Sequence, residues 1–214
     1  MLDRLRHLIQ CNFGTFRGFI RFLLGEAEYL LGSAAPFLRE DLSDVRRLVF
    51  VCLGNINRSA YAQAIAIERN LNSISFGLST STGAPAFHRA VGTAAHFGND
   101  LSNHAALDMS DFKPLEGDLF LVMELRHARQ LERSGIARRD IALLGAWASP
   151  RRLHLHDPYK CDPAYFRTCF TLIRSAVCNL AAHLEVQGSP AAPGGTKMAG
   201  TVPTVQALPD ISVN

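Results

Sequence analysis

From residue 47 onward, short runs rich in Val, Ile, Leu and Phe alternate with longer stretches of helical spacing. Four runs have the length and composition of buried strands: 47–52, 74–79, 118–123 and 141–144. Four stretches have the spacing of helices: 59–71, 89–97, 126–134 and 164–186. Strands that alternate with helices predict a parallel sheet covered on both faces. We therefore expect a three-layer α/β fold with a four-stranded parallel sheet.

The chain of 214 residues is long enough for one such domain with extensions at both ends. We expect the α/β domain to span residues 45–187. Residues 188–214 carry four prolines among glycines and serines without periodicity, which predicts a disordered C-terminal tail.

Residues 1–44 are predicted to form an amphipathic extension. The Phe- and Leu-rich stretch 13–31 is interrupted by two arginines and two glutamates, so it lacks the roughly 18 apolar residues of a membrane-spanning helix. It also lacks the layout of a signal peptide. Four glycines weaken it as a single helix: Gly14, Gly18, Gly25 and Gly32. We expect its apolar face to dock on the domain or on a partner protein, with peripheral binding to a membrane surface as the alternative.

The charge and the cysteines exclude several classes of protein. A formal net charge of +3 is too small to indicate a nucleic-acid-binding protein. The five cysteines are irregularly spaced and include no CxxC pair, so neither a disulfide framework nor a zinc site is predicted. We expect no metal and no cofactor. A reducing compartment, and hence the cytoplasm, suits these thiols best.

A cysteine and an arginine enclose five residues directly after the first predicted strand. Cys52 ends that strand, and Arg58 begins the next predicted helix. A loop of this length curls into a bowl whose backbone N–H groups converge on an anion, and the helix N-terminus adds its dipole. The guanidinium of Arg58 can bind two phosphate oxygens at once. The predicted phosphate-binding residues are Leu53, Gly54, Asn55, Ile56, Asn57, Arg58 and Ser59.

The field that binds a phosphate also favours the thiolate form of the sulfur, and Ser59 can donate a hydrogen bond to it. Cys52 is therefore predicted to be a nucleophile that attacks phosphorus. The alternative is that Cys52 is a small buried apolar residue and Arg58 a surface residue. Placement between a buried strand and an alanine-rich helix favours the first interpretation.

The segment Val-Cys-Leu-Gly-Asn-Ile-Asn-Arg-Ser at 51–59 resembles the phosphate loop of the low-molecular-weight protein tyrosine phosphatases. The resemblance covers roughly residues 46–186 and continues at 81–83, 98–104, 123–127 and the Asp-Pro-Tyr segment 157–159. It implies a cysteine-dependent phosphatase that hydrolyses phosphotyrosine on proteins, and aryl phosphates, through a cysteinyl-phosphate. Bacterial members often act on tyrosine kinases that control polysaccharide export, so such a kinase is the implied partner.

The resemblance also implies roles for residues outside the loop. Asp157 would donate a proton to the leaving phenolate and then act as base towards water. Tyr159 would form one wall for an aromatic ring, and Phe87 or His88 the opposite wall. The alternatives are an ordinary Asp-Pro turn at Asp157 and simple packing at Phe87.

The chain departs from the family pattern at a few positions. Asn57 stands where many members have a second cysteine, so a protective disulfide with Cys52 is not available by that route. Ala60 replaces a frequent proline and Gln63 a frequent glutamate, and neither is expected to touch the chemistry. His154 and His156 could be metal ligands, but no further ligand set is evident.

Two other functions are compatible with such a loop. An arsenate reductase shares the fold but passes oxidation to two further cysteines, and residues 124–160 contain none. A non-catalytic phosphate-binding module would often lose the cysteine, the arginine or the acid, and all three are present. Of the remaining cysteines, Cys169 and Cys178 are expected in the core, whereas Cys161 is expected to be accessible.

Overall fold

Four parallel strands form the sheet in the computed structural model, which describes residues 2–187. The strands lie in the order β2-β1-β3-β4. Their bounds are β1 (Arg47–Cys52), β2 (Ser73–Gly77), β3 (Asp118–Val122) and β4 (Ile141–Leu143). Because every neighbouring pair is parallel, all four carboxyl ends lie at one edge of the sheet, where ligands bind in folds of this kind.

The central strand β1 is buried on both faces. Val51 is in register with Phe76 of β2 and with Val122 of β3. Successive side chains alternate between two cores, since Phe50 belongs to one and Val49 to the other. Burial on both faces explains why the strand is a continuous apolar run rather than an alternating one.

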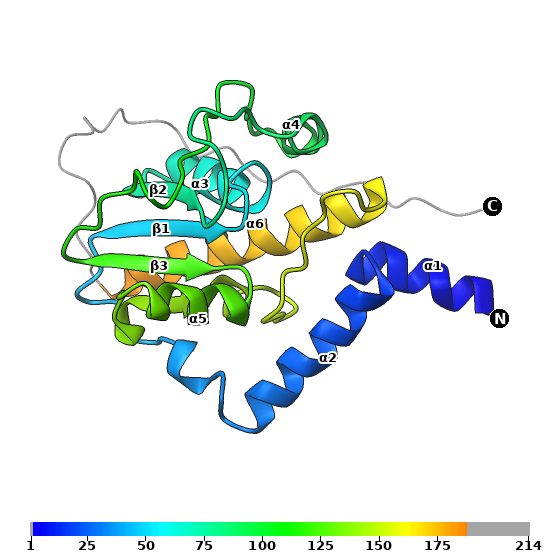
Figure 1. Cartoon of the computed structure of the whole chain (residues 1–214), viewed down its shortest axis with the longest axis horizontal. Helices are drawn as coiled ribbons and strands as arrows, with labels where there is room; N and C mark the ends of the chain where they lie inside the picture. Colours follow the sequence, from blue (N-terminus) through cyan, green and yellow to red (C-terminus); the bar gives the residue numbers. More distant parts are fainter. Residues whose placement is uncertain (1, 188–214) are drawn as a thin grey trace, which may run out of the picture.

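Helices cover both faces of the sheet (Figure 1). One face packs against α3 (Arg58–Glu68), α4 (His88–His96) and α6 (Pro163–Val186), and the other against α5 (Leu125–Arg133). Short 3₁₀ turns complete the connections: η1 (Ala35–Phe37), η2 (Arg138–Asp140) and η3 (Leu144–Ala146). The predicted three-layer α/β fold is confirmed, and no element end differs from the prediction by more than three residues.

The N-terminal segment folds as two helices, α1 (Leu2–Phe13) and α2 (Phe16–Leu30). The break falls at Gly14, whose φ of +77° suits glycine and few other residues. Thr15 then caps α2, because its Oγ1 accepts a hydrogen bond of 2.9 Å from the backbone N–H of Gly18. We call residues 2–30 the N-terminal hairpin.

The N-terminal hairpin packs on the rest of the chain at the carboxyl edge of the sheet. α1 contacts α6, and α2 runs past the loop that precedes α6 (Figure 1). Within residues 2–187, no helix combines the length and the apolar composition needed to cross a membrane. The predicted C-terminal tail, 188–214, lies outside the residues that the structure describes.

Candidate active site

The loop that follows β1 surrounds the sulfur of Cys52 with hydrogen-bond donors. The Oγ of Ser59 lies 2.9 Å from Sγ, and the backbone N–H of Asn55 donates to Sγ at 3.3 Å. The sulfur is buried at the carboxyl end of the central strand and next to the N-terminus of α3. A hydroxyl, a backbone amide and a helix N-terminus therefore all lie at this sulfur.

Asn55 fixes the shape of the loop. Its φ is +51°, in the left-handed region that asparagine tolerates better than most residues. Its side-chain Nδ2 donates to the hydroxyls of Ser59 at 2.9 Å and Ser75 at 2.7 Å. Its Oδ1 accepts from the backbone N–H of Leu107 at 2.9 Å, and a ring nitrogen of His104 lies 2.6 Å from its carbonyl oxygen. These hydrogen bonds hold Asn55 in its left-handed conformation, and we expect them to preserve the loop shape that would bind an anion.

Gln63 belongs to the same network. Its Oε1 accepts a hydrogen bond of 2.6 Å from the hydroxyl of Ser75, which in turn accepts from Asn55. Gln63 was expected not to touch the chemistry, and it does not reach the Cys52 sulfur. It does, however, support the loop that surrounds this sulfur.

The guanidinium of Arg58 connects the loop to two carboxylates. Its Nη1 donates to Oε1 of Glu124 at 2.7 Å and to the carbonyl of Leu155 at 2.9 Å. Its Nη2 lies 2.9 Å from Oδ2 of Asp157 in an ion pair. The buried Nε of Arg58 has no hydrogen-bond partner within residues 2–187. A buried donor without a protein acceptor is costly, and a phosphoryl oxygen would satisfy it.

Glu124 fixes the Arg58 guanidinium by accepting the hydrogen bond from Nη1. It lies two residues after β3, at the N-cap position of α5, and its carboxylate also accepts two hydrogen bonds from Arg126, at 2.6 and 3.0 Å. Burial alone would raise the pKa of this carboxyl, but the positive charge of Arg58 and the other groups around it, including the hydrogen bond from Arg126, together outweigh burial and hold the pKa well below its usual range. Glu124 is therefore a buried negative charge that fixes the orientation of Arg58.

Two histidines beside Glu124 are buried as neutral rings. His127 Nε2 lies 3.9 Å and His154 Nδ1 3.7 Å from the Glu124 carboxylate. Burial lowers the pKa of His127 to about 3 and the pKa of His154 to about 4, despite the neighbouring negative charge.

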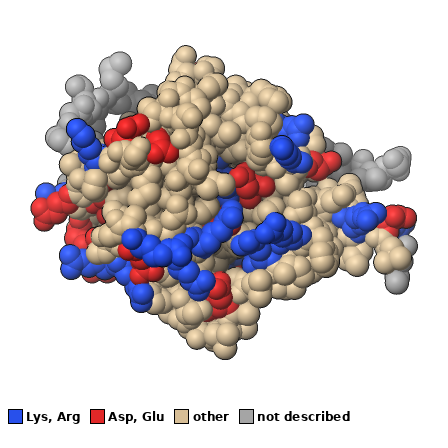
Figure 2. Space-filling view, viewed as in Figure 1, with Lys and Arg blue, Asp and Glu red and all other residues tan. Residues whose placement is uncertain are grey.

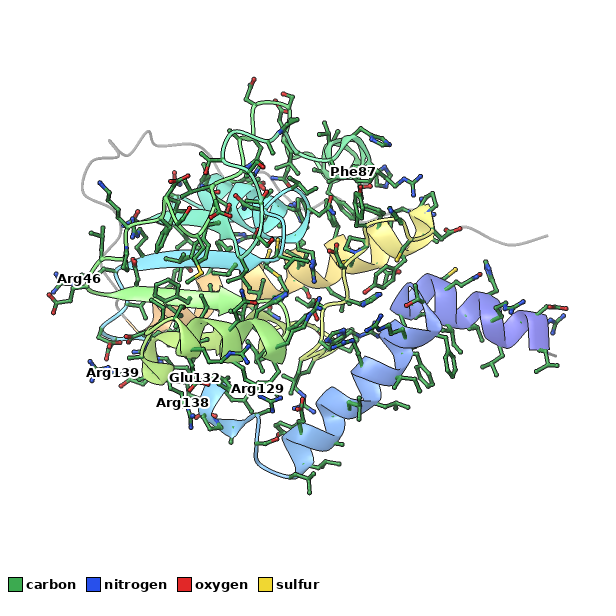
Figure 3. The ribbon with its side chains drawn as sticks, viewed as in Figure 1. Arg46, Phe87, Arg129, Glu132, Arg138 and Arg139 are labelled. Carbon is green, nitrogen blue, oxygen red and sulfur yellow. The ribbon has the colours of Figure 1, made fainter. Side chains whose placement is uncertain are left out.

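The remaining predicted residues lie around Asp157. The Asp157 side chain is 28% exposed and therefore accessible to a substrate. The Tyr159 and Phe87 rings meet edge to face with 4.9 Å between centroids, and the His88 ring lies 4.3 Å from that of Phe87. In Figure 3, Phe87 lies beside the first turn of α4, near the start of α6. The Phe87 ring therefore contacts both of the other rings, and the assignment of Tyr159 and of Phe87 or His88 to opposite walls stays a prediction.

His154 and His156 do not assemble a metal centre. Their rings stack with 5.8 Å between centroids, and in the part of the chain that the structure describes no group of three His, Cys, Asp or Glu side chains has the arrangement of a metal site. Instead, both histidines pack against α2, where a ring nitrogen of His156 lies 3.2 Å from Oγ1 of Thr15.

The other cysteines near the site are buried. Cys161 is only 7% exposed, which corrects the expectation that it is accessible. Its sulfur lies beside Gly14, where a Cβ atom would be 3.0 Å away, and donates to the carbonyl oxygen of Asp157 at 3.5 Å. Burial raises the pKa of Cys161 to about 11 and the pKa of Cys169 to about 12. Cys178 is partly exposed, so of the two helical cysteines only Cys169 is fully buried. Thiols protonated this firmly are poor partners for a redox relay.

Sequence reasoning brought together Cys52, Arg58 and Asp157, and the structure places all three at one edge of the sheet. It missed Glu124, Ser75 and His104. A signal for Glu124 was present, because an acid directly after a buried parallel strand must lie at the same edge as the phosphate loop. Ser75 and His104 had no local signal, since only the fold brings them to Asn55.

A three-layer α/β fold with a cysteine and an arginine in one anion-binding loop defines a class of cysteine-dependent phosphatases. The family model of the low molecular weight phosphotyrosine protein phosphatases matches residues 47–189. The chain belongs to this family. The match begins at the first residue of β1, so the N-terminal hairpin lies outside it.

Curated relatives carry the same family name. The chain is 31% identical over 148 residues to the low molecular weight protein-tyrosine-phosphatase Wzb of Salmonella typhi, which covers 67% of this chain and 98% of the relative. It is 29% identical over 136 residues to the probable low molecular weight protein-tyrosine-phosphatase EpsP of Ralstonia nicotianae, covering 62% of this chain and 92% of the relative.

Solved structures share the fold. Wzb of Vibrio vulnificus in complex with benzylphosphonate matches with a TM-score of 0.57 at 26% identity, covering 64% of this chain and 97% of that one. The YwlE arginine phosphatase of Geobacillus stearothermophilus matches with the same TM-score of 0.57 at 20% identity, covering 66% and 94%, which is evidence for the fold alone.

Proposed function

We propose that this chain hydrolyses phosphotyrosine on proteins, and simple aryl phosphates, with Cys52 as the nucleophile, Arg58 as the phosphate ligand and Asp157 as the acid and base. The observation that carries the proposal is the position of Arg58. It starts the helix after the Cys52 loop, and its Nη2 lies 2.9 Å from the Asp157 carboxylate. One guanidinium thus brings the nucleophile and the acid to the same phosphoryl group.

The first step transfers the phosphoryl group to sulfur. The Cys52 thiolate attacks phosphorus in line, the bond from phosphorus to the phenolic oxygen breaks, and Asp157 gives its proton to the departing phenolate. Arg58 and the loop N–H groups hold the equatorial oxygens, where negative charge is concentrated.

The second step releases phosphate. Water attacks the cysteinyl-phosphate, the Asp157 carboxylate accepts a proton from that water, and the thiolate leaves. Ser59, with its Oγ 2.9 Å from Sγ, donates a hydrogen bond that stabilises the thiolate as it leaves. No group other than water is consumed, and both the enzyme thiolate and the acid are regenerated.

The aromatic surface of Tyr159 and Phe87 supports a phenyl ester as substrate. Tyr159 is 44% exposed and follows Asp157 by two residues, so its ring can pack against the ring that carries the phosphate. Matched peptides with phosphotyrosine or phosphoserine at one position test this preference. We expect turnover of the phosphotyrosine peptide alone, whereas equal turnover of both would contradict a phenyl-specific cleft.

The likeness to the protein-tyrosine-phosphatases Wzb and EpsP supports a protein substrate. We propose that the enzyme acts in the cytoplasm and that its substrate is a bacterial tyrosine kinase of polysaccharide export. A panel of phosphopeptides from the tyrosine-rich regions of such kinases, compared with unrelated phosphotyrosine peptides, tests this assignment. Equal kcat/KM across the panel would argue against a dedicated kinase substrate.

The outer face of the N-terminal hairpin supports docking on an anionic membrane surface. Three leucines spaced three residues apart in α1 are more than half exposed: Leu2 at 81%, Leu5 at 55% and Leu8 at 58%. Arg4 and Arg6 flank this stripe at helical spacing, and neither forms an ion pair with any residue from 2 to 187. Figure 2 shows further arginine and lysine side chains across the middle of the molecule. Apolar side chains flanked by arginines are typical of helices that lie in a lipid interface.

Sedimentation with vesicles tests the docking. We expect binding to vesicles that contain phosphatidylglycerol and weaker binding to pure phosphatidylcholine. The triple change Leu2→Ala, Leu5→Ala, Leu8→Ala is expected to abolish binding without changing hydrolysis of p-nitrophenyl phosphate. Unchanged sedimentation of the triple variant, or no binding to either vesicle, would contradict membrane docking and leave a protein partner for this face.

A further inference from the structure

The loop that carries Asp157 is attached to the N-terminal hairpin at several points. We call residues 147–162, between η3 and α6, the acid loop. Arg151 at its start forms an ion pair of 2.9 Å with Glu26 of α2, and its guanidinium lies 3.8 Å from the centroid of the Tyr29 ring. Arg152 donates to the backbone carbonyl of Asn12 at the end of α1. The first part of the acid loop is therefore anchored on both helices of the hairpin.

The closest attachment is at His156, the residue directly before Asp157. Gly18 of α2 is buried against its ring, because a Cβ atom at Gly18 would lie 2.8 Å from the Cδ2 atom of His156. Thr15, the N-cap of α2, lies with its Oγ1 3.2 Å from a ring nitrogen of the same histidine. Glycine inside a helix costs about 1 kcal/mol relative to alanine, so a buried glycine at this point is explained by the close approach of two groups, the Phe13 carbonyl oxygen, which is the nearer, and the His156 ring.

A second contact holds His156 through its backbone. The hydroxyl of Tyr165 donates to the carbonyl oxygen of His156 at 3.1 Å. The Tyr165 ring in turn packs on Gly14, where a Cβ atom would lie only 2.7 Å from the ring. Gly14 and Gly18 of the hairpin thus contact the Tyr165 ring, which fixes the His156 backbone, and the His156 ring itself.

From these contacts we propose that the N-terminal hairpin positions Asp157 for proton transfer, with Gly18 and Thr15 as positioning residues that act through His156. The inference rests on the proposed role of Asp157 as the acid. A proton donor must lie within hydrogen-bond reach of the leaving oxygen, and displacement by about 1 Å costs up to 100-fold in rate. A loop between η3 and α6 has few regular hydrogen bonds of its own, so its geometry depends on what packs against it.

Two alanine substitutions in the same helix form a matched pair for testing this proposal in the full chain. Gly18→Ala places a Cβ atom against His156 and against the Phe13 carbonyl, whereas Gly25→Ala places it at an ordinary 3.7 Å from the Cβ of His154. We expect Gly18→Ala to lower kcat/KM, which reports the phosphoryl transfer to sulfur, about tenfold or more on phenyl phosphate, which needs the proton, and less than about threefold on p-nitrophenyl phosphate, which does not. Gly25→Ala is expected to leave both rates unchanged.

A second pair covers the case in which Gly18→Ala does not fold. Thr15→Val removes the contact to His156, and Thr15→Ser restores both the cap and the hydroxyl. We expect Thr15→Val to show the same dependence on the leaving group and Thr15→Ser to recover wild-type rates. Equal losses in kcat/KM on both substrates, or no loss on either in a folded variant, would overturn the positioning role.

The background Asp157→Asn separates this proposal from the proposed function. In that background, Gly18→Ala is expected to have no further effect on phenyl phosphate, because the group that it displaces is already inactive. If Asp157→Asn itself shows no dependence on the leaving group, the acid assignment fails. If the effect of Asp157→Asn depends on the leaving group and the effect of the hairpin variants does not, only the positioning role fails.

Discussion

Nη2 of Arg58 lies 2.9 Å from Oδ2 of Asp157, so the phosphate ligand and the acid of the proposed reaction are in direct contact. The same guanidinium is held from the other side by Glu124, whose side chain is 1% exposed. A phosphoryl oxygen that approaches Nη2 would compete with Asp157 but not with Glu124. Substrate binding would thereby release Asp157 to face the leaving oxygen while Arg58 stays in place.

Replacing the buried carboxylate tests the part that Glu124 plays. Glu124→Gln keeps an acceptor for Arg58 but removes the charge, so we expect a higher KM for aryl phosphates, a lower kcat and a loss of about 2 kcal/mol in the free energy of unfolding. Steady-state kinetics and urea denaturation measure these effects.

The control for this change is Glu132→Gln. Glu132 pairs with Arg138 on the surface of α5, as Figure 3 shows, and the Arg138 side chain is 60% exposed. Exposed pairs contribute about 0–1 kcal/mol, so this variant is expected to keep wild-type kinetics. Similar kinetics for Glu124→Gln and Glu132→Gln would show that Arg58 does not need the buried charge.

Substitution of the acid is expected to depend on the leaving group. Asp157→Asn removes the proton that a poor leaving group needs in the first step, so kcat/KM on phenyl phosphate should fall about 100-fold or more, and kcat/KM on p-nitrophenyl phosphate much less. A plot of log kcat/KM against the leaving-group pKa measures this difference as a steeper negative slope. A slope equal to that of the wild type would argue against Asp157 as the acid.

His154, one of the two buried histidines beside Glu124, makes the free energy of unfolding depend on pH. The pKa of His154 is about 4 in the folded protein, and that of an unfolded histidine is about 6.5, so the unfolded state binds more protons between these values. Stability is therefore full above about pH 6.5 and decreases as the pH falls towards 4. We expect His154→Gln to reduce the loss of unfolding free energy between pH 7 and 5.5 by about 1 kcal/mol.

Urea denaturation at the two pH values measures that loss. The control His96→Gln changes an exposed histidine of α4 and is expected to keep the wild-type dependence. An unchanged pH dependence in His154→Gln would show that His154 does not stay neutral in the fold.

The α/β domain could be predicted from the sequence because its signals are local. A short apolar run such as 47–52 is typical of a buried strand, and the Cys-x5-Arg spacing places the loop at the carboxyl end of this strand. The hairpin could not be placed in the same way. Gly14 and Gly18 were interpreted as weak points of a helix, and only the packed structure shows that they allow close approach to Tyr165 and His156.

His156 illustrates the same limit from the other side. His154 and His156 are separated by one residue, and this spacing suggested metal ligands. Spacing alone does not distinguish a ligand from a packing residue. The contact with Thr15 is 141 positions away in the chain, and no local rule predicts a contact of that range.

The central claim, that Cys52 attacks phosphorus, is tested most directly by turnover of p-nitrophenyl phosphate with the wild-type chain and with Cys52→Ser. The hydroxyl is a far weaker nucleophile than a thiolate, but the loop and Arg58 are unchanged, so phosphate binding is expected to persist. The proposed mechanism predicts turnover by the wild type and none by Cys52→Ser, with inorganic phosphate bound by both. Equal turnover by both proteins would contradict it.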